Sequence, residues 1–592
     1  MAYDTFVTAA VADEIKNCLV SGKVIKIHQP DRFSILIKFH TFAGNPKLLL
    51  SAHPVDARVH LTQNAKENPL KPPLFCMVLR KWLEGARLVS VTQPSLERIL
   101  RLEFATHNEL GDEVSCFLIA EIMGKHSNLI LTDAQDKIID AIRRYSHLVS
   151  RYREVLPGRD YVPPPPQDKL PLHANLEDFS KSLLEHSFEQ NILSAFGQNV
   201  AGLSPLMAKE LLLRANIEPQ TPVCEMGEYE MSRILSAMHT LDQALLSLDF
   251  SPTVLESDKN ALPLDLAAFD LTLWLDQKTI RFDSQQKMSD TLDYYYQKIE
   301  THALFEHVKN ELRKQIKAHI KRLEKKIVIQ EKDFAKSEAG NLYKEAGDLL
   351  SANLYHLKKG LSQVELSDFY HEGEPITIDL NPALTPEQNV KRYYHLYGKC
   401  KNAYHLIQKQ LQENREEYDY LSSVLTMAEQ SETVDALAEI RHELIQGNYI
   451  KDKASGKKKA PTPQQQPPRS TVSQDGFAIL IGRNNRQNDK LTLKMATKED
   501  IWLHTQKIPG SHVIIQAEGK PIPDSTITEA AAYAAWYSKA QSSPKVPVDY
   551  TFADQVKKPN GAKPGMVIYF NQKTLYVTPK IPDQACDQES NK

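Results

Sequence analysis

The spacing of hydrophobic positions in the first half of the chain predicts an α+β segment followed by a helical one. In residues 1–165, short apolar runs such as SILIKF, KLLLSA and LILTD alternate with stretches of helical spacing. Prolines at 163–166 end this segment as a stiff boundary. Residues 170–285 are mainly of helical pattern, and a Gly-Leu-Ser-Pro turn at 202–205 separates two helical runs. We expect a helix-hairpin-helix element there, whose turn glycine lets backbone amides approach a phosphate, although a plain linker between helices has the same pattern.

Between residues 288 and 430 the apolar positions keep a helical period over unusually long stretches. The first stretch carries a stripe from Phe305 to Ile327 at spacings of three and four. The second contains a seven-residue repeat of Val390, Tyr397, Tyr404, Leu411, Tyr418 and Leu425, and a second seam follows it three residues later. Helices with this repeat pair as coiled coils, so we expect a long antiparallel arm whose tyrosines are core. Residues 363–382 have the turn and strand signals of a small tip motif.

A polar segment and a local change of charge mark the C-terminal part. Residues 451–474 are rich in lysine, proline and glutamine, which predicts a mobile basic linker. The whole chain has a net charge of −3, whereas residues 475–580 carry an excess of five Lys and Arg over Asp and Glu. Contacts with phosphates would therefore use local basic surfaces rather than bulk charge.

Composition and short motifs exclude several classes of protein. Hydrophobic residues at 41% and charged residues at 25% are typical of globular protein. The six cysteines form no CxxC pair, so the usual zinc spacings are missing and reduced thiols are expected. The N-terminus lacks the basic start and apolar core of a signal peptide, and no uncharged run has membrane-spanning length. These two features lead us to expect a cytoplasmic protein. The chain also contains no P-loop, GxGxxG, HExxH or GxSxG motif, so we expect no metal, cofactor or catalytic chemistry of its own.

The densest group of candidate nucleic-acid contacts lies in residues 482–515. Cations suit phosphates, amides suit base edges and sugars, and an indole can stack on a base. This stretch supplies all three kinds: Arg483, Asn484, Asn485, Arg486, Lys490, Trp502, His504 and Lys507. An ordinary solvated face with the indole in the core would have the same composition. Two N-terminal segments supply further candidates: Arg80, Lys81, Lys125 and His126. We expect segment 121–131 to run from a helix end through a glycine turn, which carries Lys125 and His126, into a strand.

Several blocks of the sequence resemble the NFACT family. GRNNRQND and EDIWLHTQKIPGSHVII are similar to its C-terminal RNA-binding domain. The segments at 25–30, 67–85 and 121–131 are similar to blocks of its N-terminal domain, in the same order. The resemblance covers nearly the whole chain, and several blocks in order are far more specific than any one alone.

The resemblance implies a multidomain α+β fold. It would comprise a glycosylase-like α/β N-terminal domain, a helix-hairpin-helix domain, a long antiparallel coiled coil and a small α/β C-terminal RNA-binding domain. The expected boundaries are 1–168 for the N-terminal domain, 169–285 for the helical domain, 286–445 for the arm with its tip, 446–474 for the linker, 475–580 for the RNA-binding domain and 581–592 for a disordered tail.

The resemblance also implies partners and a role. Members of this family bind large ribosomal subunits obstructed by peptidyl-tRNA, recruit tRNA, mainly tRNA-Ala in bacteria, and support untemplated alanine tailing of the stalled chain. The ribosomal centre forms the peptide bonds, so the protein itself is not an enzyme. The arm would reach rRNA and stalk-base proteins, and no membrane or DNA partner is expected.

The tailing motif of the family is an Asp-Arg pair followed by Ile, whereas this chain reads Glu97-Arg98-Ile99. Glu97 and Arg98, together with Asp4, are therefore the candidate tRNA contacts. The glutamate is one methylene longer than the family's aspartate, so charge is kept and reach changes. A surface ion pair of little consequence is the alternative for the pair.

Two other classes of protein remain to be weighed. A surface-displayed fibronectin-binding adhesin is what an older description of the family implies, and the lack of a signal peptide counts against it. A DNA-repair-like lyase would share the order of the first two domains. Those glycosylases use an N-terminal proline amine, whereas Ala2 and Tyr3 stand here, and the paired cysteines of their zinc finger are missing.

Overall fold

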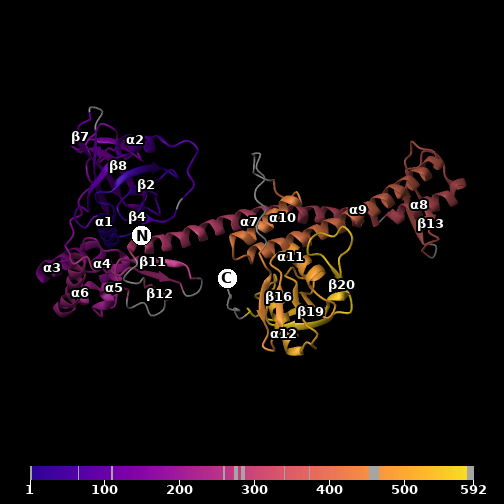
Figure 1. The fold of residues 1–592 in the computed structure, drawn as a ribbon. Coiled ribbons are helices and arrows are strands. Elements are labelled where there is room, and N and C mark those ends of the chain that lie inside the picture. Colours follow the sequence, from indigo (N-terminus) through magenta and orange to yellow (C-terminus); the bar gives the residue numbers. More distant parts are fainter. Residues whose placement is uncertain are drawn as a thin grey trace. The chain divides into compact units, whose positions relative to one another are not determined.

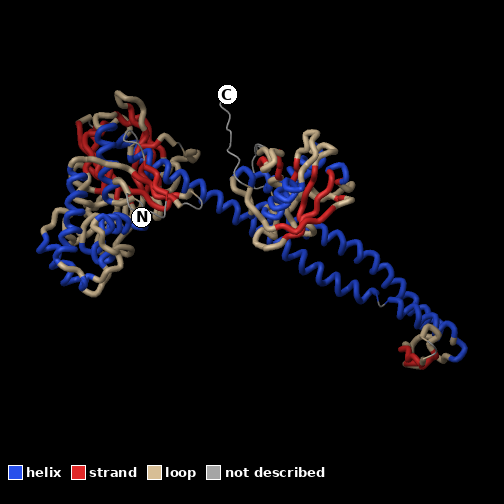
Figure 2. The backbone as a smooth tube through the Cα atoms, turned by 90° about the horizontal axis from the view of Figure 1, so that it is seen from below, coloured by secondary structure: helices blue, strands red, loops and turns tan. Residues whose placement is uncertain are grey.

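The computed structural model describes residues 3–64, 66–107, 111–257, 261–271, 278–281, 287–338, 340–371, 374–451 and 466–582. It divides into two compact units, residues 1–302 and 303–592, and each is described by itself (Figures 1 and 2). In the described part of the chain, no helix combines the length and the apolar composition that crossing a bilayer requires.

The first unit contains a nine-stranded antiparallel sheet in the order β4-β3-β2-β1-β5-β6-β7-β8-β9. Its strands are β1 (Lys23–His28), β2 (Ser34–His40), β3 (Lys47–Ser51), β4 (Arg58–Thr62), β5 (Arg87–Thr92), β6 (Ile99–His107), β7 (Glu113–Glu121), β8 (Asn128–Asp133) and β9 (Ile138–Ala141). The apolar runs SILIKF, KLLLSA and LILTD are β2, β3 and β8, so the α+β prediction is confirmed. The glycosylase-like topology of this domain and the domain boundaries remain predictions.

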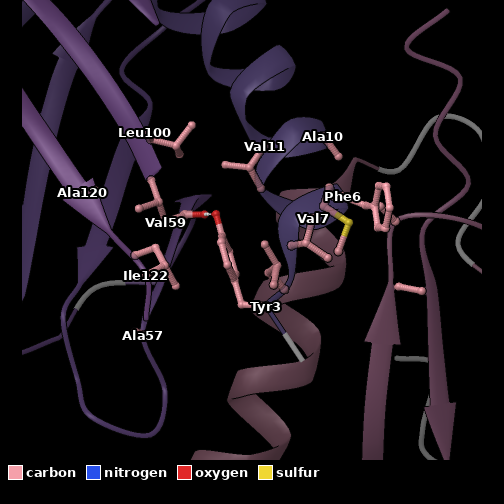
Figure 3. Packing of buried hydrophobic residues seen from close by; sticks show 14 of the residues in the cluster. Tyr3, Phe6, Val7, Ala10, Val11, Ala57, Val59, Leu100, Ala120 and Ile122 are labelled. Carbon is pink, nitrogen blue, oxygen red and sulfur yellow. Dashed lines mark hydrogen bonds between the residues drawn. The ribbon is translucent and has the colours of Figure 1, made fainter. Parts of the chain in front are cut away.

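Two helices pack on this sheet, α1 (Thr5–Leu19) and α2 (Leu74–Leu83). The apolar face of α1 is fully buried, and Tyr3 just before it lies in the same core (Figure 3). The Tyr3 hydroxyl donates a hydrogen bond of 2.8 Å to the Val59 carbonyl of β4. The start of α1 is thereby fixed to the sheet, which matters because a candidate site residue, Asp4, lies there.

Two secondary-structure expectations for the first unit need correction. The sequence predicts a helix end at the start of segment 121–131, but Glu121 ends the strand β7, and a 3₁₀ turn at Gly124–His126 leads into β8. The apolar run before Glu121 has the same composition in a buried strand as in a buried helix, and only sheet pairing distinguishes them.

The second correction concerns the helical region after residue 170. The helices α3 (Leu176–Ser187), α4 (Ile192–Asn199), α5 (Pro205–Arg214) and α6 (Glu228–Leu246) confirm its first part. A three-stranded sheet then follows, in the order β11-β10-β12, from β10 (Thr253–Glu256), β11 (Pro263–Ala267) and β12 (Lys278–Arg281). These strands are too short for their alternation to stand out in a sequence.

The second unit contains two long helices, α7 (Met288–Glu338), which begins in the first unit, and α9 (Pro386–Glu429). Contacts such as Arg313–Glu429, Arg415–Glu331 and the stacked rings of Phe334 and Tyr404 show that the helices are antiparallel. In the predicted repeat, Val390 and Leu411 are buried, whereas Tyr397, Tyr404, Tyr418 and Leu425 are half-buried. The tyrosines therefore lie at the edge of the packed face of α9 rather than within the core. The packing of side chains as knobs into holes, which defines a coiled coil, remains a prediction.

A polar layer crosses the helix pair among the apolar ones. Buried Asn414 of α9 donates to the Gln330 side chain of α7 at 2.6 Å and accepts from Lys326 at 3.0 Å, and Gln330 donates to Gln410. Polar residues at core positions of paired helices fix their register, because a shifted register leaves them without partners.

The far end of the helix pair carries α8 (Gly340–Ala352) and a hairpin of β13 (Gln363–Ser367) and β14 (Pro375–Asp379). The hairpin falls within the predicted tip motif, of which residues 372–373 lie outside the described residues. After α9, the helix α10 (Val434–Gln446) packs back on the pair.

The C-terminal domain of this unit is a six-stranded antiparallel sheet in the order β15-β16-β18-β17-β19-β22, covered on one face by α12 (Asp524–Trp536). Its strands are β15 (Arg469–Val472), β16 (Ala478–Ile481), β17 (Ile501–Thr505), β18 (Val513–Ile515), β19 (Val546–Phe552) and β22 (Lys573–Val577), and a small hairpin of β20 (Val556–Lys557) and β21 (Ile568–Tyr569) accompanies them. The predicted linker therefore ends earlier than expected, because β15 is part of the sheet. Residues 452–465 of the linker and 583–592 of the tail lie outside the described residues.

Candidate nucleic-acid interface

A cavity of about 1190 Å³ in the first unit brings together five segments that are distant in the sequence. They are the start of α1, the loop between β5 and β6, the proline-rich segment before α3, the turn between α4 and α5, and the end of α6. Asp4, Glu97 and Arg98, the three residues that the sequence proposes for tRNA, all line this cavity, and so do Gly202 and Ser204 of the predicted helix-hairpin-helix turn.

Two hydrogen bonds hold the loop between β5 and β6 against α1, and a third closes the loop on itself. Gln93 donates through its side-chain amide to the Thr5 carbonyl at 3.1 Å and to the Glu97 carbonyl at 2.8 Å. The Thr5 hydroxyl donates to the Leu96 carbonyl at 3.1 Å. Glu97 and Arg98 are half-buried rather than fully accessible. Gln93 and Thr5 therefore position the backbone of Glu97 and Arg98. Neither residue had a predicted role, and the glutamine at the start of the loop was the only feature of the sequence that could have indicated one.

The turn between α4 and α5 requires its glycine. Gly202 has a φ of +76°, and a Cβ there would lie 3.3 Å from the Thr5 side chain and 3.4 Å from that of Leu96. A side chain at this position would therefore meet both strain and crowding. Ser204 caps α5 by accepting a hydrogen bond from the Met207 N–H. The N-terminus of α5 and its turn consequently face the cavity beside Glu97 and Arg98.

Asp4 is the buried carboxylate of the cavity, with a side chain that caps α1. It accepts hydrogen bonds of 3.0 Å from the Phe6 and Val7 N–H groups. Burial raises the pKa of Asp4 to about 6, although bonds from the Val7 backbone and the Ser204 side chain oppose the increase. A carboxylate with a raised pKa in a cavity marks a candidate functional site.

We expect Asp4→Asn to change how stability depends on pH. Because the pKa of Asp4 is raised from 3.8 to about 6 on folding, the native state binds more protons between these values and becomes less stable as pH rises through that window. The asparagine still caps the helix but does not titrate. The stability of Asp4→Asn relative to the unchanged chain should therefore increase by about 2 kcal/mol between about pH 4.5 and pH 7.5.

Denaturant unfolding of the first unit at the two pH values measures this difference. Asp31→Asn is the matched control, because Asp31 also accepts a backbone N–H but is exposed. Parallel pH curves for Asp4→Asn and the unchanged chain would show that burial of Asp4 carries no such penalty.

The other N-terminal candidates do not line the cavity. The Arg80 side chain donates to the Ile27 carbonyl at 2.8 Å and lies 3.6 Å from Glu84. Lys81 is exposed on α2, and Lys125 and His126 are exposed on the 3₁₀ turn before β8. These residues remain candidates for a separate contact with RNA.

The asparagines of the GRNNRQND motif have a different role from the predicted one. Asn484 caps the short helix α11 (Asn485–Lys490) and donates to the Glu439 carboxylate of α10 at 2.5 Å. Asn485 donates to the Ser423 hydroxyl of α9 at 3.0 Å and to Glu443 of α10 at 3.5 Å. Both amides are buried. They dock the C-terminal domain on α9 and α10, so neither is available to base edges.

The two arginines of the motif also contact protein. Arg483 donates to the Pro467 carbonyl at 2.9 Å, and Arg486 binds Gln446 of α10. Trp502 is fully buried, with its ring 4.8 Å from that of Tyr569, so it is a core residue rather than an exposed stacking surface.

Two predicted contacts of the C-terminal domain, Lys490 and Lys507, are exposed to solvent. His504, beside the Trp502 ring, is half-buried, as are Arg483 and Arg486. Sequence reasoning could not separate these residues from the buried ones, because the partners that bury Asn484 and Asn485 lie about 45 residues earlier in the chain.

We expect Asn485→Ala to loosen this docking. The change removes the amide that donates to Ser423 and to Glu443. Burial already raises the pKa of Glu443, so the loss of a donor there adds to an existing cost. Leaving a buried polar group unsatisfied costs about 1–3 kcal/mol. Amide hydrogen exchange should become faster in α10 and α11, whereas Asn560→Ala, which removes an exposed asparagine of the same domain, should leave it unchanged. Unaltered exchange in Asn485→Ala would contradict the docking role.

The described fold is that of a multidomain α+β protein with a pair of long helices and a C-terminal domain docked on α9 and α10. Comparison with known proteins identifies its class. Residues 468–570 match the family model of the NFACT protein RNA binding domain, which defines an RNA-binding protein. Residues 4–463 match the model of the NFACT N-terminal and middle domains. The chain belongs to the NFACT family.

Relatives with curated names agree with this assignment. The chain is similar to the Rqc2 homolog RqcH of Bacillus subtilis, with 38% identity over 588 residues and 98% of each chain covered. It is also similar to the human ribosome quality control complex subunit NEMF, with 28% identity over 141 residues, 24% of this chain and 12% of NEMF.

The chain is also similar to a solved structure, that of the C-terminal part of the fibronectin/fibrinogen-binding protein from Streptococcus suis. The identity is 35% and the TM-score 0.38, and the match covers 47% of this chain and 96% of that one.

The names of the curated relatives and the two family models support a role in ribosome quality control.

Proposed function

We propose that this protein binds large ribosomal subunits obstructed by peptidyl-tRNA, recruits tRNA-Ala and promotes untemplated alanine tailing of the stalled chain, which marks it for degradation. The ribosomal peptidyl transferase centre would form the peptide bonds, so the protein acts in the cytoplasm as a recruitment factor and not as an enzyme. The arm would reach rRNA and stalk-base proteins. The observation that carries the proposal is the convergence of Asp4, Glu97 and Arg98 on one cavity with the turn at Gly202.

The chemistry of the cavity suits a segment of RNA. Arg98 offers a planar guanidinium for phosphates or base edges, and the N-terminus of α5 offers backbone N–H groups to an anion. Asp4 and Glu97 offer acceptors to amino groups of bases. The volume of about 1190 Å³ exceeds the roughly 300–1,000 Å³ of small-molecule sites, which favours a macromolecular ligand.

A fibronectin-binding adhesin is not favoured as an alternative. The Streptococcus suis protein of known structure is described as fibronectin/fibrinogen-binding. Curated relatives that match over 98% of this chain are named Rqc2 homolog RqcH instead, and the matched C-terminal family model is described as RNA binding. A cavity lined by Arg98 and a helix N-terminus gives a physical reason for RNA binding.

Sequencing the RNA that copurifies with the tagged full-length chain tests the proposal. We expect enrichment of tRNA-Ala and of large-subunit rRNA over an untagged control purification. Enrichment of other tRNAs would overturn the assignment of tRNA-Ala, and RNA at background level would overturn the proposed function as a whole.

A further inference from the structure

One stretch of α7 in the second unit has a strong excess of positive charge. Residues 309–326 contain eight Lys or Arg and two Glu, whereas the whole chain is slightly acidic. Apolar residues of the stretch face α9 and α10, and the basic ones at 313, 314, 317, 321, 322 and 325 are exposed. Such a face is often only solvated, so the charge alone does not define a site.

A groove beside this face supplies a second observation. A cavity of about 350 Å³ is lined by Lys317 and Lys321 of α7, by α9 residues including Tyr418 and Glu429, and by Lys539 of the C-terminal domain. Lysines from two separate parts of the unit thus line one groove. We call the set Lys317, Lys321 and Lys539 the cationic groove.

Lys539 is held at this groove by the docking of the C-terminal domain. Gln430 at the end of α9 donates through its side-chain amide to the Trp536 and Ser538 carbonyls, at 3.3 and 3.1 Å. The Lys539 N–H donates to the Pro509 carbonyl at 2.9 Å. Arg469 of β15 lies over the Tyr537 ring at 4.5 Å and donates to the Gln430 carbonyl. The groove therefore exists only while the domain is docked.

The carboxylates around the groove leave part of its charge uncompensated. Glu429 lies 3.6 Å from Lys317 and 3.1 Å from Arg313, so it serves two cations at once. Glu324 also lines the groove. In the part of the chain that the structure describes, neither Lys321 nor Lys539 has a carboxylate partner within ion-pair distance.

We propose that the cationic groove binds the phosphate backbone of RNA, as a second RNA contact distinct from the cavity at Asp4 and Arg98. Along α7 the basic residues 314, 317, 321 and 325 recur every three or four positions, so they form one stripe. At 1.5 Å per residue, successive charges are about 4.5–6 Å apart along the axis, which suits a regularly spaced polyanion better than scattered protein carboxylates. Tyr418 in the wall of the groove offers a ring beside the cations.

The proposal rests on the proposed function, because the RNA would be part of the ribosome-bound complex. It adds that the docked C-terminal domain and the helix pair bind RNA jointly. Loosening the docking through Asn485→Ala should therefore weaken the same RNA contact without changing any basic residue.

The test is a charge reversal in the full-length chain. Lys317→Glu, Lys321→Glu and Lys539→Glu are combined, and binding of a short labelled RNA duplex of mixed sequence is measured over a range of salt concentrations. Each lost phosphate contact should flatten the log–log salt dependence by about 0.7–0.9, so a total decrease of about two is expected, with at least a tenfold loss of affinity at low salt. The control combines Lys332→Glu, Lys336→Glu and Lys409→Glu, which change the same charge at exposed positions farther along α7 and on α9.

Further measurements separate the possible outcomes. The corresponding Lys→Gln triple variant, which introduces no new repulsion, should reduce the slope by a similar amount and keep the melting temperature. An unchanged salt slope in either groove variant, or an equal loss in the control, would overturn the proposal. Polyglutamate binding as tight as the duplex, and lost in the same variants, would assign the groove to acidic protein instead. Binding of deacylated tRNA-Ala tests the cavity separately, so the two proposals can fail independently.

Discussion

Arg98→Ala is expected to abolish alanine tailing while leaving the stability of the chain almost unchanged. Arg98 lines the cavity together with Asp4 and the turn at Gly202, and the side chains of Gln93 and Thr5 hold its loop against α1. The loop should therefore keep its conformation when the arginine side chain is lost. Arg98 is not part of the apolar core of this unit, and substitutions outside the core usually change stability by less than about 0.5 kcal/mol.

A tailing assay on a stalled reporter, run beside a thermal melt, measures both parts of this expectation. Arg101→Ala is the matched control, because Arg101 lies on the adjoining strand β6, pairs with Asp136 at 2.7 Å and does not line the cavity. It should lose some stability and keep tailing. Tailing by Arg98→Ala at the level of the unchanged chain, or a loss that follows unfolding, would remove Arg98 from the site.

Glu97→Asp refines the same prediction. It restores the residue that the family's motif has at this position, so tailing should be unchanged or increased. The loop backbone at Glu97 is fixed by Gln93. A shorter side chain consequently moves only the carboxylate, by roughly one bond length.

The long helices and the first sheet could be predicted from the sequence because their signals are periodic and local. A seven-residue repeat from Val390 to Leu425 leaves few alternatives to a packed helix, and strands such as β2 and β3 have continuous apolar runs. The three residues of the cavity could be proposed only because the sequence resembles a family motif. That they meet Gly202 follows from tertiary packing, which no local pattern encodes.

The role of the GRNNRQND motif could not be predicted for a related reason. Asparagine and arginine suit RNA and buried protein contacts equally well by their chemistry. The choice depends on Glu439 and Glu443 of α10, whose acceptors meet Asn484 and Asn485 only in the folded unit. The short strands β10 to β12 and the ion pair between Glu121 and Arg153 were missed because each depends on partners distant in the sequence.

Arg153→Met is expected to cause the largest loss of stability in the first unit. Glu121 at the end of β7 is fully buried, and Arg153 binds both of its carboxylate oxygens at 2.6 Å. The Tyr161 hydroxyl donates to the same carboxylate at 2.9 Å. Removing one member of a buried pair leaves an uncompensated charge, which costs about 3–5 kcal/mol. Arg159→Met, which removes an exposed partner of Glu154, should cost less than about 1 kcal/mol.

Arg153→Met should also affect the candidate site, because Arg153 holds the backbone next to one wall of the cavity. Arg153 also donates to the Val162 carbonyl at 2.8 Å, directly before Pro163 and Pro164, which line the cavity. Arg153 is thus a positioning residue for one wall of the cavity, and Arg153→Met should weaken tRNA binding at temperatures where the unit is still folded.

Combining Arg153→Met with Glu121→Leu removes the buried charge and should recover much of the stability, because apolar replacement of a whole buried pair is often neutral. Denaturant unfolding and tRNA binding, measured on the single and double variants, check both steps. Recovery of stability without recovery of tRNA binding is the expected pattern, and a single variant as stable as the Arg159→Met control would show that the pair does not hold this part of the fold.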